Sequence, residues 1–255
     1  MTLLTSEKFT KGMILLLFAP LLISCNPDEE EEEDDEPIST LIQFGNGVTD
    51  IEGNQYQTVI IGNQEWMAEN LRTKTYNNGD PITQNTDPDL WPFQDQGLWT
   101  WYDNDPVNET PYGVLYNWNA AMDSRSLCPS GWHVPSDDEW GQLTLFLDPT
   151  ADTTCESCVH SSTAGGKLKS TGIQHWQTPN SLASNESGFS GMPGGYLSST
   201  FYFSDLTELG LWWSSTEPAL NSNYAINRTL YFDSANIGEY YSSKGFGLCV
   251  RCIKD

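Results

Sequence analysis

Leu-Cys-Pro-Ser-Gly-Trp-His-Val-Pro-Ser-Asp-Asp-Glu-Trp, residues 127–140, is the stretch around which the rest of the chain is organised. Its segment Pro129-Ser130-Gly131 is typical of a tight turn, because proline fixes φ and glycine adds conformational freedom. Ser136 and Glu139 have the spacing of a capping box, in which each side chain bonds the backbone amide of the other residue. The stretch therefore predicts that a helix begins after Ser136 and that Cys128 anchors the approach to it.

The predicted helix covers residues 137–147. Trp140, Leu143 and Leu147 recur at helical spacing and would share one apolar face. The Asp148-Pro149 pair ends the helix, because the residue before a proline is disfavoured in helical conformation. We expect the apolar face to pack into the core.

The N-terminus has the features of a secretory signal over residues 1–24. Its apolar run, residues 13–23, is shorter than the roughly 20 residues that a membrane-spanning helix needs. Leu22-Ile23-Ser24 then precedes Cys25 as in a bacterial lipobox, so Cys25 is predicted to be lipidated and to anchor the protein in a membrane. The alternative is an ordinary signal peptide followed by a chance cysteine.

An acidic linker is predicted over residues 25–47. Residues 28–36 are nine consecutive Asp or Glu residues, a block that repels itself and stays extended in water. The block resembles the surface-export signal of lipoproteins in the Bacteroidota, which implies an outer-membrane lipoprotein exposed at the cell surface. A solvated spacer on the periplasmic side is the alternative.

The remaining chain, residues 48–255, is also acidic. The full sequence has 35 acidic and 11 basic residues; residues 1–47 hold 10 and 2 of them, which leaves a net charge of -16. Such a charge would repel phosphates and excludes a nucleic-acid partner. It does not identify a partner of opposite charge.

Six cysteines are present, and without Cys25 five are left to pair. The compartment beyond the inner membrane permits disulfides, but connectivity does not follow from sequence alone. Cys155 and Cys158 are close enough to form a local disulfide. Asp152 and His160 flank them and suggest a metal site, but a single Cys-x-x-Cys is a weak zinc signal, so we favour the disulfide.

Short strands and turns dominate the rest of residues 48–255, which we take as one domain. A hairpin is predicted from Tyr56–Ile61 and Glu65–Ala68 around Gly62-Asn63. A second short helix is predicted over 112–123, long loops over 73–111, and further strands over 211–216, 224–232 and 246–253. The fold class is therefore α+β, with two short helices, small antiparallel sheets and long loops.

Aromatic residues in the 73–111 loops are the candidates for ligand binding, because aromatic faces stack on sugars and anchor interfaces. They are Trp91, Trp99, Trp101 and Tyr102. The alternative, which we favour for any one of them, is that they fill the core beneath the loops. The core is also predicted to contain Trp66, Trp118, Trp132, Trp140 and Trp213.

A calcium site is considered at Asp103, Asn104 and Asp105, whose side chains could supply oxygen ligands. A turn with local side-chain hydrogen bonds is favoured over the metal site. No other cofactor is predicted. Three histidines, His133, His160 and His175, are available for catalysis, but no nucleophile elbow, zinc-protease or phosphate-loop motif accompanies them. The sequence therefore favours a protein that is not an enzyme.

Several motifs occur together and in order, and they resemble the Fibrobacter succinogenes major paralogous domain over residues 48–255. They are Asp50-x-Glu52-Gly53-Asn54-x-Tyr56, Trp66-Met67-x-Glu69-Asn70-Leu71, Tyr112-Gly113-x-Leu115-Tyr116-Asn117-Trp118, Cys128-Pro129-x-Gly131-Trp132-His133-Val134-Pro135, Gly188-Phe189-Ser190, Trp213-Ser214-Ser215-Thr216 and Gly247-x-x-Val250-Arg251-Cys252. The resemblance implies a C-type-lectin-like fold, related to the domain of formylglycine-generating enzymes.

That fold implies that the last strand is tied to a helix region by a long-range disulfide, so we predict Cys128–Cys252, with Cys249 left as a buried thiol. The calcium-holding Glu-Pro-Asn and Trp-Asn-Asp motifs of sugar-binding lectins are not found in the sequence. The resemblance implies no activity. We therefore expect a non-catalytic surface module that binds a glycan or a protein; a structural component of a surface complex is the alternative.

Overall fold

The capped helix forms where the sequence predicts it. In the computed structural model, α3 spans Asp137–Leu147. The Ser136 hydroxyl accepts a hydrogen bond from the Glu139 amide at 3.3 Å, and the Glu139 carboxylate accepts one from the Ser136 amide at 2.7 Å. This capping box satisfies backbone donors that the first helical turn leaves unpaired, which is worth about 1 kcal/mol.

The apolar face of α3 packs into an aromatic core, as expected. Trp140, Leu143 and Leu147 are buried, and the Trp140 ring lies 4.7 Å from the ring of Trp66. Phe189 and Trp212 complete this group of rings. The five tryptophans that the sequence assigns to the core are all buried.

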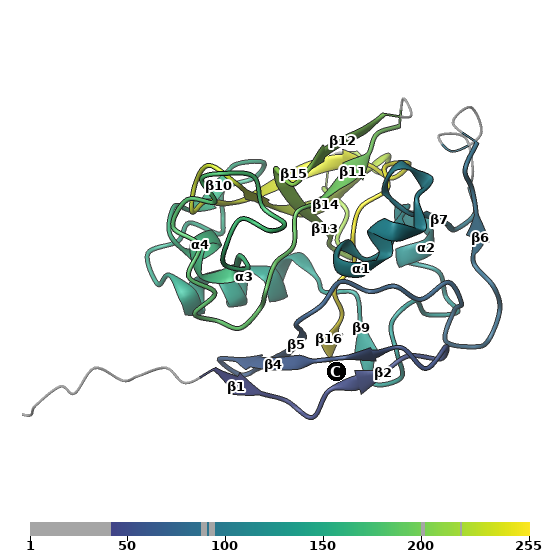
Figure 1. Ribbon diagram of the computed structural model, residues 1–255, viewed down its shortest axis with the longest axis horizontal. Helices are drawn as coiled ribbons and strands as arrows, with labels where there is room; N and C mark the ends of the chain where they lie inside the picture. The colour runs from purple at the N-terminus through teal and green to yellow at the C-terminus, as the bar shows by residue number, and fades with distance from the viewer. Residues whose placement is uncertain (1–41, 88–90, 92–94, 200–201, 220) are drawn as a thin grey trace, which may run out of the picture. The chain divides into compact units, whose positions relative to one another are not determined.

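A five-stranded sheet joins the beginning and the end of the folded part, in the order β1-β4-β5-β16-β9. The strands are β1 Gln43–Phe44, β4 Thr58–Ile61, β5 Gln64–Met67, β9 Trp132–His133 and β16 Ile253–Lys254. The hairpin β4–β5 turns at Gly62-Asn63 as predicted. Figure 1 shows β16, near the C-terminus, lying between β5 and β9. Because β1 pairs with β4, the folded part begins before Val48, the start predicted from sequence.

A four-stranded antiparallel sheet, β10-β15-β14-β13, forms the second half. Its strands are β10 Val159–Ser161, β13 Leu209–Trp213, β14 Tyr224–Tyr231 and β15 Ile237–Ser243. A separate hairpin pairs β11 Gly194–Leu197 with β12 Phe203–Leu206. Side chains alternate along β14, so that Asn227 and Thr229 point to one face and Arg228 points to the other.

The remaining elements are short. They are β2 Val48–Thr49, β3 Gln55–Tyr56, β6 Thr83–Gln84, β7 Leu98–Thr100, β8 Leu115–Tyr116, the 3₁₀ turns η2 Tyr102–Asn104 and η3 Pro106–Asn108, and the helices α1 Glu109–Tyr112, α2 Trp118–Ala121 and α4 Ala164–Leu168. The prediction of one helix over 112–123 was wrong: Leu115 lies on a strand that pairs with β7, and apart from Tyr112 at the end of α1 only 118–121 is helical. The prediction of a strand over 246–253 was also wrong: Gly247, Leu248 and Cys249 make isolated bridges, and only Ile253 belongs to a strand.

Two disulfides agree with the sequence predictions. Cys128 pairs with Cys252, 124 residues further on, and ties β16 to the approach of α3. Cys155 pairs with Cys158, which removes both thiols from any metal site. Cys249 is free and buried, and burial raises the pKa of its thiol to about 12, so it stays protonated.

A buried guanidinium connects distant segments. The Arg251 side chain donates to Asn70 Oδ1 at 2.9 Å, to Ser190 O at 2.8 Å and to Phe189 O. Asn70 Oδ1 also accepts from the indole of Trp212 at 2.8 Å, and Arg251 lies 4.0 Å from the centroid of the Phe189 ring. Burial lowers the pKa of Arg251 to about 9. Segments around residues 70, 190, 212 and 251 are therefore held at one point.

The structure describes residues 42–87, 91, 95–199, 202–219 and 221–255. The predicted signal segment, Cys25 and the acidic run lie outside these residues. Within the described part of the chain, none of the helices has the length and apolar character to cross a membrane.

Candidate functional site

The face of the four-stranded sheet and the neighbouring hairpin line an open depression of about 280 Å³, which we call the aromatic cleft. Four of the residues that line it are aromatic. The lining consists of Tyr196, Asp205, Leu209, Leu211, Asn227, Thr229, Tyr231, Tyr240, Ser242 and Phe246. Rings and apolar side chains with a few polar groups are typical of a ligand site.

A hydrogen-bond network around Asn227 makes up the floor of the cleft. Asn227 donates to Tyr240 O and to Ser242 Oγ, both at 3.0 Å, and accepts from the Thr229 hydroxyl at 3.0 Å. The side chains of Asn227, Thr229 and Ser242 are buried. Because the Asn227 amide has all of these bonds in a buried place, it stiffens the part of β14 and β15 that forms the floor.

The walls are aromatic rings that are only partly buried. Tyr196 and Phe246 stack in parallel, with ring centroids 5.7 Å apart and planes 8° from each other. The Tyr240 ring lies over Gly238 of the same strand, and a side chain at position 238 would collide with this ring. Burial and a hydrogen bond between the hydroxyls of Tyr231 and Tyr240 raise the pKa of Tyr231, so its hydroxyl stays neutral.

Asp205 supplies the charge in the cleft. It lies on β12, and its Oδ1 accepts from the Ser204 hydroxyl at 3.0 Å. The hairpin that carries it is supported from behind by Tyr102, whose ring lies 5.3 Å from the ring of Phe203. Gly195, with a φ of +59°, lets β11 approach this support, because a Cβ there would meet both Ser204 O and the Tyr102 ring.

The aromatic residues predicted as ligand contacts lie elsewhere. Trp91 and Trp99 are 0% and 5% exposed, and their indoles donate to Gly245 O and Ile82 O. Tyr102 is also buried. Trp101 is half-buried, and its indole donates to Glu109 at 2.7 Å. The burial of Trp91, Trp99 and Tyr102 agrees with the alternative that the sequence favours for each of them, namely that they fill the core beneath the loops.

Two of the three residues considered as calcium ligands, Asn104 and Asp105, make hydrogen bonds within their own turn. Asn104 Oδ1 accepts from the Thr100 hydroxyl at 2.7 Å, and Asp105 Oδ1 accepts from the Val107 amide at 3.0 Å and caps η3. Asp103 is exposed in left-handed conformation. Among the described residues, no three His, Cys, Asp or Glu side chains form a group that could hold a metal ion. Nothing in this turn supports the metal site.

Each histidine contacts a different set of residues. His133 lies between Asp255, at 2.6 Å from Nδ1, and Glu139, at 2.9 Å from Nε2. Burial would lower the pKa of His133, but hydrogen bonds to Asp255 and Glu139 outweigh it and raise the pKa. His175 packs its ring against Tyr112.

A buried charge cluster surrounds the third histidine. His160 Nε2 lies 3.1 Å from Glu239 and 2.9 Å from Cys155 O. Arg228 pairs with Glu239 at 3.7 Å and with Asp137. Burial raises the pKa of Glu239, but His160 and Arg228 outweigh it and lower the pKa. The cluster joins β14 and β15 to the N-terminus of α3, which is a structural role.

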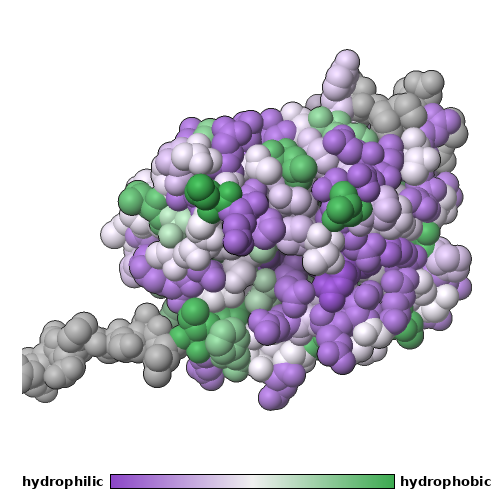
Figure 2. Space-filling model, viewed as in Figure 1, coloured by the Kyte–Doolittle hydropathy of each residue, from purple (hydrophilic) through white to green (hydrophobic). Residues whose placement is uncertain are grey.

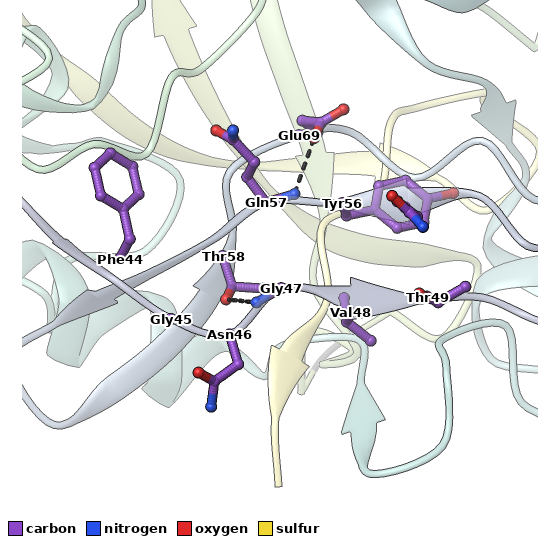
Figure 3. Close-up of a pocket in the computed structure, with 11 residues that line it drawn as sticks. Phe44, Gly45, Asn46, Gly47, Val48, Thr49, Tyr56, Gln57, Thr58 and Glu69 are labelled. Atoms are coloured by element: carbon purple, nitrogen blue, oxygen red, sulfur yellow. Dashed lines mark hydrogen bonds between the residues drawn. The ribbon is translucent and has the colours of Figure 1, made fainter.

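A larger cavity, of about 670 Å³, lies between the β1–β2 turn and strands β3 and β4. Figure 3 shows that its polar groups bond each other: Gln57 N donates to Glu69 at 2.9 Å and Gly47 N donates to the Thr58 hydroxyl at 3.0 Å. Two of the residues that line this groove are aromatic, Phe44 and Tyr56, against four in the aromatic cleft.

The arrangement defines a domain of small antiparallel sheets, tied by a long-range disulfide, with an aromatic cleft at its surface. The family model of the Fibrobacter succinogenes major domain matches residues 59–254. The chain belongs to this family. Comparison with curated proteins gives no match, and comparison with solved structures gives none.

The motifs that carried the resemblance build the frame rather than the cleft. Asn70, Phe189 and Arg251 meet at the buried guanidinium, and Cys128 and Cys252 form the disulfide. The cleft residues Tyr196, Asp205, Tyr231, Tyr240 and Phe246 lie outside those motifs. The sequence analysis missed Tyr240 because β15 was not predicted, and it missed Tyr196 and Asp205 because the β11–β12 hairpin was not predicted. The pattern Tyr-Ser-Ser from Tyr241 and the alternation Asn227-x-Thr229-x-Tyr231 were the available signals.

Proposed function

We propose that the protein is a lipid-anchored, surface-exposed and non-catalytic binding module, and that the aromatic cleft is its ligand site. One observation carries the site: four partly exposed rings and a carboxylate line one cavity, whose floor is a buried hydrogen-bond network. The chemistry of such a lining suits recognition of a glycan or of a protein side chain. The histidines described above are engaged in structural contacts, which supports a role without catalysis.

The anchor is the second part of the proposal. Its support is the lipobox-like segment before Cys25 and the acidic run after it. Cells expressing the full chain are labelled with a radioactive fatty acid and then treated with protease. We expect label on the wild type and none on Cys25→Ser, with the domain cleaved on intact cells. Label on both chains, or full protection of the domain, would contradict the anchor or the surface location respectively.

We also propose a fold that is more specific than a general arrangement of small sheets and short helices. We infer a C-type-lectin-like arrangement, supported by the meeting of N- and C-terminal strands in one sheet and by the disulfide that ties the last strand to the α3 region. A crystal structure of the chain, compared with solved lectin-like domains, tests this. A different strand order in the two principal sheets would overturn it.

Binding at the cleft is tested on a glycan array with the full chain in detergent. Tyr196→Leu keeps apolar bulk but removes a ring face from the cleft. Tyr224→Leu is the matched control, because Tyr224 is an exposed tyrosine on β14 that does not line the cleft. We expect hits that persist in EDTA, that Tyr196→Leu loses and that Tyr224→Leu keeps. Hits that both variants keep would refute the site.

A structural role in a surface complex is the second candidate. Figure 2 shows a largely hydrophilic face with apolar residues gathered at the lower left, over β1. Ile42 and Phe44 are exposed there, beside an unpaired sheet edge. A blank array together with a crosslinked product on intact cells that Phe44→Ser abolishes would favour this role over ligand binding.

A further inference from the structure

The lining of the aromatic cleft selects for one kind of chemical group. We propose that the cleft binds an organic ammonium group, such as the trimethylammonium of choline, a methylated lysine or an amino sugar. The positive charge would lie over the tyrosine and phenylalanine rings and beside the Asp205 carboxylate. This inference rests on the proposed function, because it names the group that the binding module would recognise.

The rings provide the main attraction. The face of an aromatic ring carries negative electrostatic potential, and it attracts a cation within about 6 Å of the ring centroid. Tyr196, Tyr231, Tyr240 and Phe246 all line a cavity of about 280 Å³ and are each only partly buried. Because four rings line one small cavity, a compact cation bound there can contact more than one of them.

The amide in the floor of the cleft has its hydrogen bonds already made. Both amide hydrogens of Asn227 are donated to Tyr240 O and Ser242 Oγ, and Thr229 donates back to its carbonyl oxygen. A methylated ammonium has few or no donors and needs no partner from this amide. Binding of such a group would therefore depend on the rings and on Asp205.

The charge of the cleft has the sign that a cation needs. Asp205 is the charged residue of the lining, and no lysine, arginine or histidine is among the residues that enclose it. Within the described part of the chain, Asp205 Oδ1 has one donor, Ser204, and Oδ2 has none. Residues 48–255 carry a net charge of -16, which raises the local concentration of cations at the surface.

Choline and its neutral isostere, 3,3-dimethyl-1-butanol, test the charge directly, because they have nearly the same shape. Each is titrated into the full chain in detergent by isothermal calorimetry or by NMR. We expect choline to bind at least about tenfold more tightly than the isostere, and to bind more weakly as salt is added. Equal binding of the two, or no binding of either, would overturn the proposal.

Variants locate the effect. Asp205→Asn keeps the left-handed backbone, which asparagine also tolerates, and removes the charge; we expect choline affinity to fall about three- to tenfold while the isostere is unaffected. Tyr196→Leu should weaken choline by a similar factor. Tyr224→Leu is the control and should bind choline like the wild type. The cleft is not the choline site if Tyr224→Leu loses choline binding. It is also not the site if Asp205→Asn and Tyr196→Leu bind choline as tightly as the wild type does.

Matched pairs identify the source of the ammonium. Glucosamine is compared with glucose, and trimethyllysine with lysine, each as a competitor of choline. Preference for glucosamine points to a glycan, and preference for trimethyllysine points to a protein. If the array hits depend on Tyr196 but no ammonium probe competes with them, the inference about the ammonium is wrong and the proposed binding function stands.

Discussion

At the scale of single residues, buried charges without a carboxylate partner hold the fold together. Arg251 is fully buried, and the guanidinium donates to the carbonyl oxygens of Phe189 and Ser190 and to Asn70. Lys169 is likewise buried, and its ammonium donates to Ser181 O, Tyr231 O and Ser234 O, each at 2.8 Å. Each of these cations joins loops that are far apart in the sequence, so the loops stay ordered without regular secondary structure.

Arg251→Met should strongly destabilise the protein. The substitution keeps an apolar stem but leaves the carbonyls of Phe189 and Ser190 without donors in a dry environment, and an unsatisfied buried group costs about 1–3 kcal/mol. We expect the free energy of unfolding in urea to fall by about 3 kcal/mol or more. Arg125→Met, at a partly exposed arginine paired with Asp123, is the control and should cost about 1 kcal/mol or less. Equal losses would contradict the role of the buried hub.

His133 should make stability depend on pH. Because its pKa is raised in the folded state, it stabilises the protein fully below its ordinary pKa, near 6.5, and this stabilisation is lost as the pH rises through the raised value. The group is partly exposed, so we expect less than about 1 kcal/mol between pH 6 and pH 8. Urea unfolding of the wild type and His133→Gln at both pH values measures it. The same pH response in both proteins would show that His133 is not its source.

At the scale of elements, local signals were sufficient where short-range contacts determine the structure. The α3 helix has a cap, an apolar face and a stop within thirteen residues, Ser136–Asp148, and each could be recognised in the sequence. The 112–123 segment could not be predicted in the same way, because its strand β8 exists only by pairing with β7 and by bridging Leu248. For the same reason β15 was missed, and with it one side of the aromatic cleft.

Ser136→Ala tests the cap of α3. Removing the hydroxyl leaves the Glu139 amide without its acceptor, so we expect a loss of about 1 kcal/mol in the free energy of unfolding. Ser124→Ala, at an exposed serine outside any helix, serves as the control and should change stability little. Far-UV circular dichroism during urea unfolding gives both values. If Ser136→Ala is as stable as the control, the capping box does not stabilise the helix.

At the scale of the whole molecule, the long-range disulfide joins the two halves of the chain. Replacing both Cys128 and Cys252 by Ala opens a loop closed by residues 124 apart, which should cost about 4–5 kcal/mol. Replacing Cys155 and Cys158 opens a loop of separation 3 and should cost about 2 kcal/mol. Urea unfolding under oxidising conditions compares the two double variants. A larger loss of unfolding free energy in the variant without Cys155 and Cys158 would contradict the assignment of Cys128–Cys252 as the more stabilising disulfide.

The frame could be predicted from sequence more fully than the candidate site. The family motifs predicted the Cys128–Cys252 disulfide and the strands near the termini, because the resemblance implies a fold in which a long-range disulfide ties the last strand to a helix region. The cleft depends on Tyr196, Asp205 and Tyr240, which lie on three different elements and meet only through long-range pairing. The loop tryptophans drew attention in the sequence because they are large, and that same size places most of them in the core.

Amide hydrogen exchange of the full chain, with and without saturating choline, tests the central claim that ligand binds at the cleft and not at the loop aromatics. We predict slower exchange in β11–β12 and in β14–β15, around Asn227 and Tyr240, with residues 98–105 unchanged. Slower exchange confined to residues 98–105, or no change anywhere in the chain, would contradict the account.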